Sequence, residues 1–239
     1  MGYQETAPPP ELQGLVKASW TLRCGGKAGT WLSHRATPDG CLEIISRLHG
    51  RSIWQAEQPD CFIAGIISRP TELRLSGDGH FVGIRLWPWA WNQVGTLNAP
   101  ALIDTWADMS AAAPNVRITG DMGEALAKLT SMVRSTDDTM LGRHILESRS
   151  LAELSRRSGR TPRWLQRWFA RQIGMSPLQY IRALRFQDAF VTLQDSVETL
   201  ADHAAAHGFA DQAHMAREFR ILSGEPASRA RLMARGPFL

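Results

Sequence analysis

Short apolar runs separated by turn residues mark the N-terminal half of the chain. The runs are Ala18–Leu22, Cys41–Leu48, Cys61–Ile67, Glu72–Leu75 and Phe81–Trp87. Turn-forming residues stand between them, as in Pro38-Asp39-Gly40 and Ser76–Gly79. Runs of this length between such turns predict the strands of an all-β sandwich or small barrel. The strand pattern ends at Pro88, because proline lacks the N–H that a central strand needs.

From about Asn98 onward the sequence is rich in alanine, and the apolar spacing becomes helical. Four apolar residues at intervals of four, three and four form one stripe of a helix: Met122, Leu126, Leu129 and Val133. We expect this stripe to pack either on the β domain or on a second copy of the chain. The following residues, Ser135–Thr139, have the composition of a linker and a helix cap.

The C-terminal half contains an internal repeat. Residues 151–177 align with residues 200–226, so that Leu151-Ala152-Glu153 lies over Leu200-Ala201-Asp202 at an offset of 49. After one inserted residue the offset is 50, and it aligns Leu165, Arg167 and Phe169 with Met215, Arg217 and Phe219. Each copy reads as a helix, a turn containing glycine and a second helix, which is the pattern of a helix-turn-helix unit.

The second helix of each copy carries a polar face that suits DNA. Thr161 and Asp211 are the expected N-caps of these helices. In the major groove, arginine can donate two hydrogen bonds to guanine, and glutamine can pair with adenine. The candidate DNA-binding residues are Arg163, Gln166, Arg167 and Arg171 in the first copy, and Gln212, His214, Arg217 and Arg220 in the second.

The segment between the two copies predicts a long connecting helix. As one helix, Ser176–Gln194 would span about 28 Å at roughly 1.5 Å per residue. One turn of B-DNA measures about 34 Å, so two reading helices at this separation could enter successive major grooves on one face of the duplex.

Charge is distributed unevenly along the 239 residues. Residues 1–139 carry 12 Lys and Arg against 14 Asp and Glu, whereas residues 140–239 carry 15 Arg, no Lys and 9 Asp and Glu. The basic C-terminal part therefore favours a polyanionic partner, and guanidinium groups suit phosphate and guanine. With 44 % hydrophobic residues the chain can bury a core. It shows neither an apolar run long enough to span a membrane nor an export signal, so we expect a cytoplasmic protein.

These C-terminal motifs resemble the tandem helix-turn-helix module of AraC/XylS-type transcriptional regulators. The resemblance covers about residues 140–230, and its main segments are Pro162–Phe169, Gly174–Tyr180 and Gly208–Arg220. In that family the reading helices use positions that match Arg163, Gln166 and Arg167, and Gln212, Ala213, His214 and Arg217. The N-terminal half is similar to a β-rich domain of unassigned function often found ahead of this module, which implies a cupin-like sensor or dimerisation domain.

Histidines, cysteines and tryptophans are further candidate site residues in the N-terminal half. His34, His49 and His80 stand apart from one another, so structural or surface roles are favoured over a metal site. The cysteines, Cys24, Cys41 and Cys61, form no close pair, so buried structural thiols are favoured over thiol chemistry, and Cys41 is the one to test first. Trp87, Trp89 and Trp91 could line an aromatic pocket, although core packing is the simpler interpretation.

Together these features predict an α+β protein of two domains, a cupin-like β-sandwich or barrel followed by an all-α tandem helix-turn-helix domain. The expected division is residues 10–95 for the β domain, 96–138 for a helical linker and 139–235 for the DNA-binding domain. The expected function is a sequence-specific transcriptional regulator with no catalytic residues, metal or cofactor. Double-stranded DNA is the expected partner, with a small-molecule effector, RNA polymerase and a second copy of the chain as further candidates. A DNA-tethered metal- or thiol-dependent enzyme is the alternative, and a protein-interaction module is a third class.

Overall fold

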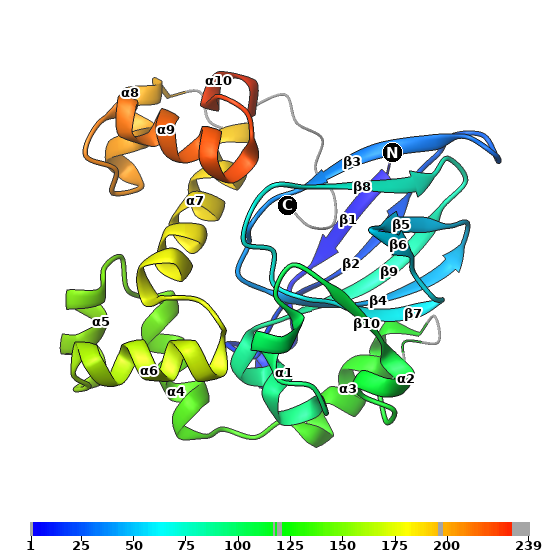
Figure 1. Cartoon of the computed structure of the whole chain (residues 1–239), viewed down its shortest axis with the longest axis horizontal. Helices are drawn as coiled ribbons and strands as arrows, with labels where there is room; N and C mark the ends of the chain where they lie inside the picture. Colours follow the sequence, from blue (N-terminus) through cyan, green and yellow to red (C-terminus); the bar gives the residue numbers. More distant parts are fainter. Residues whose placement is uncertain (1, 117, 119–120, 196–197, 231–239) are drawn as a thin grey trace.

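The computed structural model describes residues 2–116, 118, 121–195 and 198–230, so residues 231–235 of the expected DNA-binding domain lie outside the described residues. Its N-terminal part is built from antiparallel strands, which Figure 1 shows together on one side of the molecule. The strands are β1 (Gly2–Thr6), β2 (Val16–Arg23), β3 (Trp31–Ala36), β4 (Leu42–His49), β5 (Ser52–Trp54), β6 (Ala56–Glu57), β7 (Cys61–Ala64), β8 (Thr71–Ser76), β9 (His80–Leu86) and β10 (Trp106–Asp108).

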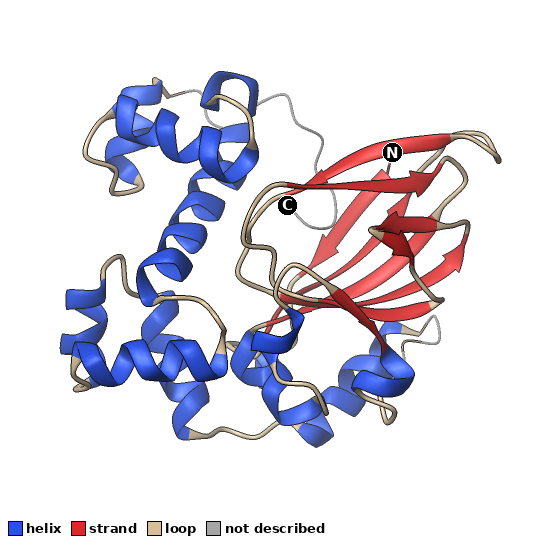
Figure 2. Cartoon of the chain, viewed as in Figure 1, coloured by secondary structure: helices blue, strands red, loops and turns tan. Residues whose placement is uncertain are grey.

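Helices make up most of the remainder of the described chain, and Figure 2 shows them beside and below the strands. The α-helices are α1 (Pro88–Val94), α2 (Met109–Ala112), α3 (Met122–Met132), α4 (Asp137–Leu146), α5 (Leu151–Ser158), α6 (Pro162–Gln172), α7 (Pro177–Asp195), α8 (Leu200–Ala206), α9 (Gln212–Ser223) and α10 (Ala227–Ala230). Two short 3-10 helices, η1 (Pro10–Leu12) and η2 (Ala99–Leu102), lie in loops of the N-terminal part.

The strands form two sheets that pack face to face. One sheet has the order β1-β2-β9-β4-β7-β10 and the other β3-β8-β5-β6, and the strand pairs in both are antiparallel. The structure thus confirms a β-rich N-terminal part followed by a helical part. Two strands of the larger sheet, β1 and β10, lie outside residues 10–95.

The central strand β4 carries buried side chains on both faces of the larger sheet. Neighbouring side chains on a strand point to opposite faces. Ile44 accordingly belongs to a core shared with the helices, while Ile45 belongs to the core between the sheets. Both residues are almost completely buried. A strand buried on both faces shows no clean alternation of polar and apolar residues, as in Leu42–His49.

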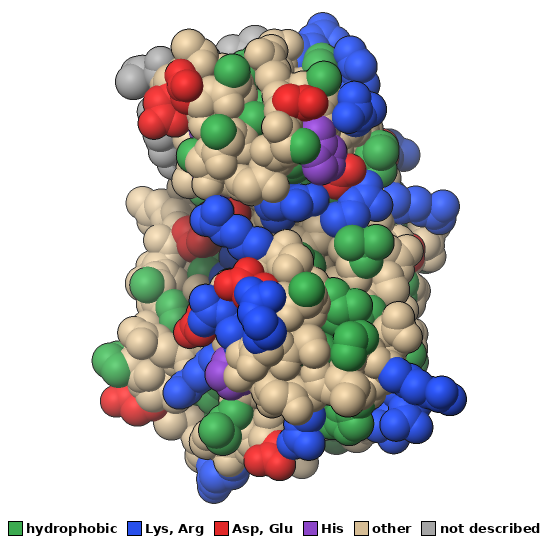
Figure 3. All heavy atoms as spheres, turned by 90° about the vertical axis from the view of Figure 1, so that its left-hand side faces the viewer, with side chains coloured by type: hydrophobic (Ala, Val, Ile, Leu, Met, Phe, Trp, Pro, Cys, Tyr) green, Lys and Arg blue, Asp and Glu red, His purple; other side chains and the backbone are tan. Residues whose placement is uncertain are grey.

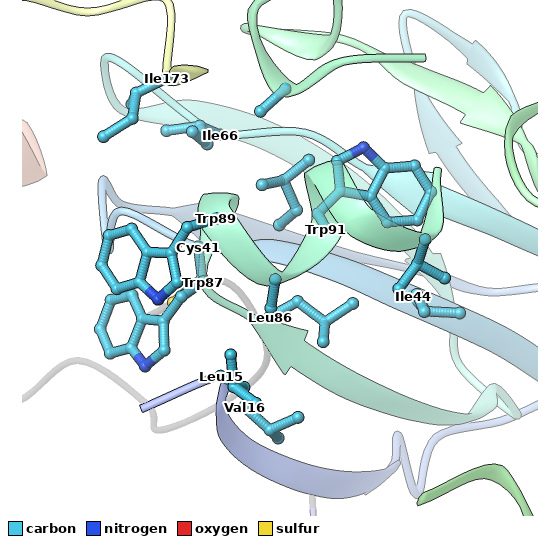
Figure 4. Close-up of a cluster of buried hydrophobic side chains, with 14 of the residues drawn as sticks. Leu15, Val16, Cys41, Ile44, Ile66, Leu86, Trp87, Trp89, Trp91 and Ile173 are labelled. Atoms are coloured by element: carbon cyan, nitrogen blue, oxygen red, sulfur yellow. The ribbon is translucent and has the colours of Figure 1, made fainter. Parts of the chain in front are cut away.

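The tryptophan-rich segment after β9 forms α1, which begins with Pro88 at its first turn. Trp89 and Trp91 are almost fully buried between the larger sheet and the helices (Figure 4). Trp87 stacks on Trp89 with ring centroids 5.6 Å apart, and the Trp89 indole N–H donates to the Gly14 carbonyl oxygen at 2.7 Å. All three tryptophans are therefore core residues, and of the three only Trp87 also borders the cavity described below.

The apolar stripe at Met122–Val133 packs within the chain. Its helix, α3, buries Ala125 and Leu129 in the core that covers the larger sheet. The next helix, α4, begins after Thr136, whose hydroxyl accepts from the Thr139 N–H while the Thr139 hydroxyl accepts from the Thr136 N–H. This reciprocal pair is a capping box, and it confirms the predicted helix cap.

The helical part contains two similar units that attach to the β domain differently. The first unit, α5 and α6, shares one continuous core with α1 and the larger sheet, through residues such as Leu165 and Phe169. The second unit, α8 and α9, has a separate core around Phe186, Phe190 and Phe219. The helix α7 joins the two units (Figure 1).

Candidate nucleic-acid interface

The first recognition helix, α6, begins where the sequence predicts. The Thr161 hydroxyl caps it by accepting from the Trp164 N–H, and Pro162 occupies the first turn. Leu165 and Phe169 are fully buried, so the opposite face of α6 is turned to solvent. The four candidate residues of this unit are exposed on that side: Arg163, Gln166, Arg167 and Arg171.

The second recognition helix, α9, follows the same plan. The Asp211 carboxylate caps it by accepting from the His214 N–H at 2.6 Å, and Met215 and Phe219 are fully buried. Three of the four candidate residues of this unit are exposed: Gln212, Arg217 and Arg220.

His214 differs from the other candidates because its ring is held by the protein. The ring is half-buried, stands edge-on to Phe209 with centroids 5.6 Å apart, and accepts the Ala210 N–H on Nδ1 at 3.2 Å. With Nδ1 accepting, Nε2 carries the ring proton, and this atom lies 4.0 Å from a Glu218 carboxylate oxygen. This arrangement holds the ring against the start of α9.

The predicted connecting helix is confirmed as α7, which runs over 19 residues. Figure 1 shows α6 beside its N-terminal end and α9 beside its C-terminal end. At roughly 1.5 Å per residue, α7 spans about 28 Å. The two recognition helices are therefore carried at opposite ends of one rigid element.

Basic side chains dominate the charged groups around the recognition helices. Figure 3 shows Lys and Arg side chains over both helical units and across the waist between them, with fewer acidic ones. No described residue forms a hydrogen bond or ion pair with the side chain of Arg163, Arg167 or Arg217. Unpaired guanidinium groups on an exposed face remain available to phosphate and base edges.

A cavity of about 790 Å³ separates the β domain from α7 and the second unit. Lys17, Arg85 and Trp87 line it on the β side, and Ile181, Leu184 and Phe190 line it on the α7 side. Arg85 is 3 % exposed and pairs with Glu43 and with Glu5, the latter at 2.9 Å. The helical side also contributes charged residues, among them Arg185 and Asp188, so the cavity has a mixed lining of apolar and charged side chains. Sequence reasoning did not find it, because its lining residues come from distant parts of the chain.

The histidines and cysteines singled out in the sequence form neither a metal-binding cluster nor a disulfide in the described part of the chain. No group of three or more His, Cys, Asp and Glu side chains there is arranged to hold a metal ion. Cys24 and Cys41 are buried, Cys61 is half-buried, and all three are free thiols. Burial raises the pKa of the Cys41 thiol well above its usual range, so the thiol stays protonated. No helix among the described residues is long and apolar enough to cross a membrane.

Two copies of a helix-turn-helix unit, each presenting a capped second helix with exposed arginines, define a DNA-binding protein of the tandem helix-turn-helix class. Comparison with protein families agrees with this class. Residues 154–233 match a helix-turn-helix domain, and residues 4–108 match a domain of unknown function (DUF6597). No curated protein matches the chain.

Solved structures with the same fold include ToxT from Vibrio cholerae. A structure at 1.65 Å has 8 % sequence identity and a TM-score of 0.51, covering 99 % of this chain and 100 % of ToxT. A structure from Vibrio cholerae O395 has 10 % identity, a TM-score of 0.50 and 98 % coverage of both chains. A third, from strain SCE256 with an unsaturated fatty acid bound, has 10 % identity, covers 91 % of this chain and 95 % of ToxT, and has a TM-score of 0.48. At these identities the first two structures show a likeness of fold alone.

The chain is a DNA-binding transcriptional regulator with an AraC-type helix-turn-helix domain at its C-terminus and a domain of unknown function at its N-terminus.

Proposed function

We propose that the chain binds double-stranded DNA by placing α6 and α9 in two successive major grooves. The observation that carries this proposal is the repeat itself: two capped helices expose equivalent arginines, Arg167 and Arg217, from opposite ends of α7. Base contacts are expected from the eight candidate residues given above. Phosphate contacts are expected from the neighbouring exposed arginines.

The test begins with selection of bound fragments from genomic DNA by the purified chain, which defines the operator. Arg167→Ala and Arg217→Ala should then each weaken binding by about 1–3 kcal/mol and relax specificity at different base positions. Arg69→Ala is the matched control, because Arg69 is an exposed arginine of the β domain. Affinity should also fall steeply with salt, since bound phosphates release counterions. Full-strength operator binding by the double variant would contradict the proposal.

We further propose that a small molecule in the cavity beside α7 controls DNA binding. An occupant would touch the β domain through Lys17 or Trp87 and the helical part through Leu184 or Phe190. It would therefore stabilise whichever arrangement of the two parts it fits. The mixed lining suits an organic molecule with an apolar body and a polar group.

A thermal-shift screen of metabolites tests the effector, because a ligand of the native state raises the melting temperature. Val191 lies at the cavity and is 47 % exposed, so Val191→Trp should fill the entrance and abolish the shift. A shift that Val191→Trp leaves intact would place the ligand elsewhere.

We propose no catalytic role for the β domain, and the buried, protonated Cys41 supports this proposal over thiol chemistry. Stoichiometric zinc or iron in the purified protein would favour the enzyme alternative. The division into residues 10–95, 96–138 and 139–235 stays a prediction. Contacts with RNA polymerase and with a second copy of the chain also stay predictions. A pull-down would test the first, and sedimentation equilibrium would test the second.

A further inference from the structure

Each recognition helix forms a side-chain bond at the same repeat position, and the sequence repeat alone did not reveal these bonds. In α6, the residue after Arg167 is Trp168, whose indole N–H donates to the Asp138 carboxylate of α4 at 2.6 Å. The offset of 50 aligns Trp168 with Glu218, the residue after Arg217 in α9. The Glu218 carboxylate accepts two hydrogen bonds from the Arg182 guanidinium of α7, at 2.8 and 2.9 Å.

Both contacts reach back to the helix that precedes the unit. The helix α4 leads into the first unit, and α7 leads into the second. The residue types differ, since one copy uses an indole donor and the other a carboxylate acceptor, yet the position and the partner helix correspond. The two contacts are therefore equivalent in place and not in chemistry.

A directional bond at this position restricts the rotation of the helix about its own axis, which apolar packing alone does not. Phe219 packs on Phe186 and Phe190, and such contacts tolerate a small roll of a helix about its axis. A bidentate guanidinium–carboxylate pair has a fixed planar geometry and limits that roll. Trp168 and Glu218 are 2 % and 7 % exposed, so water competes weakly for these bonds. The Arg182 side chain is half-buried, and an ion pair of this kind contributes little net stability, which leaves orientation as its main effect.

We infer that Trp168 and Glu218 are positioning residues that set the roll of α6 and α9, and hence the direction in which Arg167 and Arg217 enter the DNA. This inference rests on the proposed function. Because Arg167 and Arg217 adjoin the bonded residues directly, a roll of either helix swings its arginine sideways across the groove. Each contact acts on its own recognition helix.

The test uses one variant in each unit: Glu218→Gln keeps the shape of the side chain, whereas Trp168→Phe also shortens a buried ring. Trp168→Phe removes the indole N–H, and Glu218→Gln removes the charge of the pair. Binding is measured to the operator and to operators with one half-site scrambled. Trp168→Phe should weaken binding at the α6 half-site by about two- to tenfold, and Glu218→Gln should do so at the α9 half-site, the range expected for one lost hydrogen bond. Each variant should leave the other half-site unchanged.

Additional variants separate positioning from folding. Asp138 is only half-buried, so Asp138→Ala should reproduce the effect of Trp168→Phe without disturbing the core. Arg182→Lys keeps the charge but loses the planar fork, and it should reproduce the effect of Glu218→Gln. Trp164→Phe is the matched control within α6, because no described residue accepts a hydrogen bond from the Trp164 indole N–H.

The outcomes distinguish this inference from the proposed function. If the wild-type chain binds neither half-site, the proposed function fails. Equal losses at both half-sites, or no loss at either, in variants with wild-type melting temperatures would overturn the positioning role while leaving DNA binding in place. Loss confined to the matching half-site supports it.

Discussion

Replacing Tyr180 by phenylalanine measures how firmly the helical part is held against the β domain. The Tyr180 hydroxyl donates to the Gly40 carbonyl oxygen at 2.7 Å across this contact, and Tyr180 is fully buried. Burial raises the pKa of Tyr180 well above its usual range, so the hydroxyl remains a donor. A net hydrogen bond is worth about 0.5–1.5 kcal/mol, and an unsatisfied buried acceptor costs about 1–3 kcal/mol. Because the ring stays in place, we expect Tyr180→Phe to lower the free energy of unfolding by about 1–2 kcal/mol.

Urea denaturation followed by tryptophan fluorescence is the assay, since the tryptophans of α1 belong to the same core as Tyr180. The other tyrosine of the chain provides the control. Tyr3 donates to the Glu5 carboxylate on an exposed edge strand, so Tyr3→Phe should change the stability by less than about 0.5 kcal/mol. Equal effects of the two replacements would refute the reasoning that the buried bond between the two parts matters.

Three further predictions concern the β domain and the first unit. A Cβ on Gly83 would lie 2.3 Å from the Trp20 ring, so Gly83→Ala should cost about 1–3 kcal/mol, and an unchanged melting temperature would contradict this. A hydrogen bond from the Arg149 backbone N–H lowers the pKa of Glu153, so its stabilising effect is present above the usual glutamate pKa and is lost as the pH falls through the lowered value. Glu153→Gln should flatten the dependence of the melting temperature on pH in that acidic range, and an unaltered profile would speak against the bond. Buried Cys41 should resist alkylation in the native protein and react after unfolding, as mass spectrometry of the labelled peptides would show.

Local signals explain which parts of the fold the sequence predicts. The runs around β2, β4, β7, β8 and β9 have continuous apolar character between clear turns, and each forms a strand. The edge strand β1 has mostly exposed residues, and β10 is three residues long, so neither has a hydrophobic pattern to detect. The helix α1 is hidden for a different reason: its aromatic residues favour strands locally, and burial against the sheet outweighs that preference.

The candidate site shows the same limit. The caps Thr161 and Asp211 and the exposed arginines follow from spacing within one helix, and the structure places them on α6 and α9 as expected. The contacts that hold those helices, such as the pair of Arg182 and Glu218, join residues far apart in the chain. Spacing carries no information about such pairs, so only the three-dimensional arrangement reveals them.

Because the second unit has its own core, a tilt of α7 moves this unit as one body. The N-terminal end of α7 is fixed where Tyr180 meets Gly40. Its far end carries the second unit, which also meets the β domain through the ion pair of Arg35 and Glu225 at 3.2 Å. From Tyr180 to the end of α7 the helix is about 22 Å long, so a tilt of about 5° at the fixed end would move α9 by about 2 Å. A small change beside the fixed end would thus shift α9 relative to α6. The shift would change which number of base pairs between the two half-sites the chain can bind.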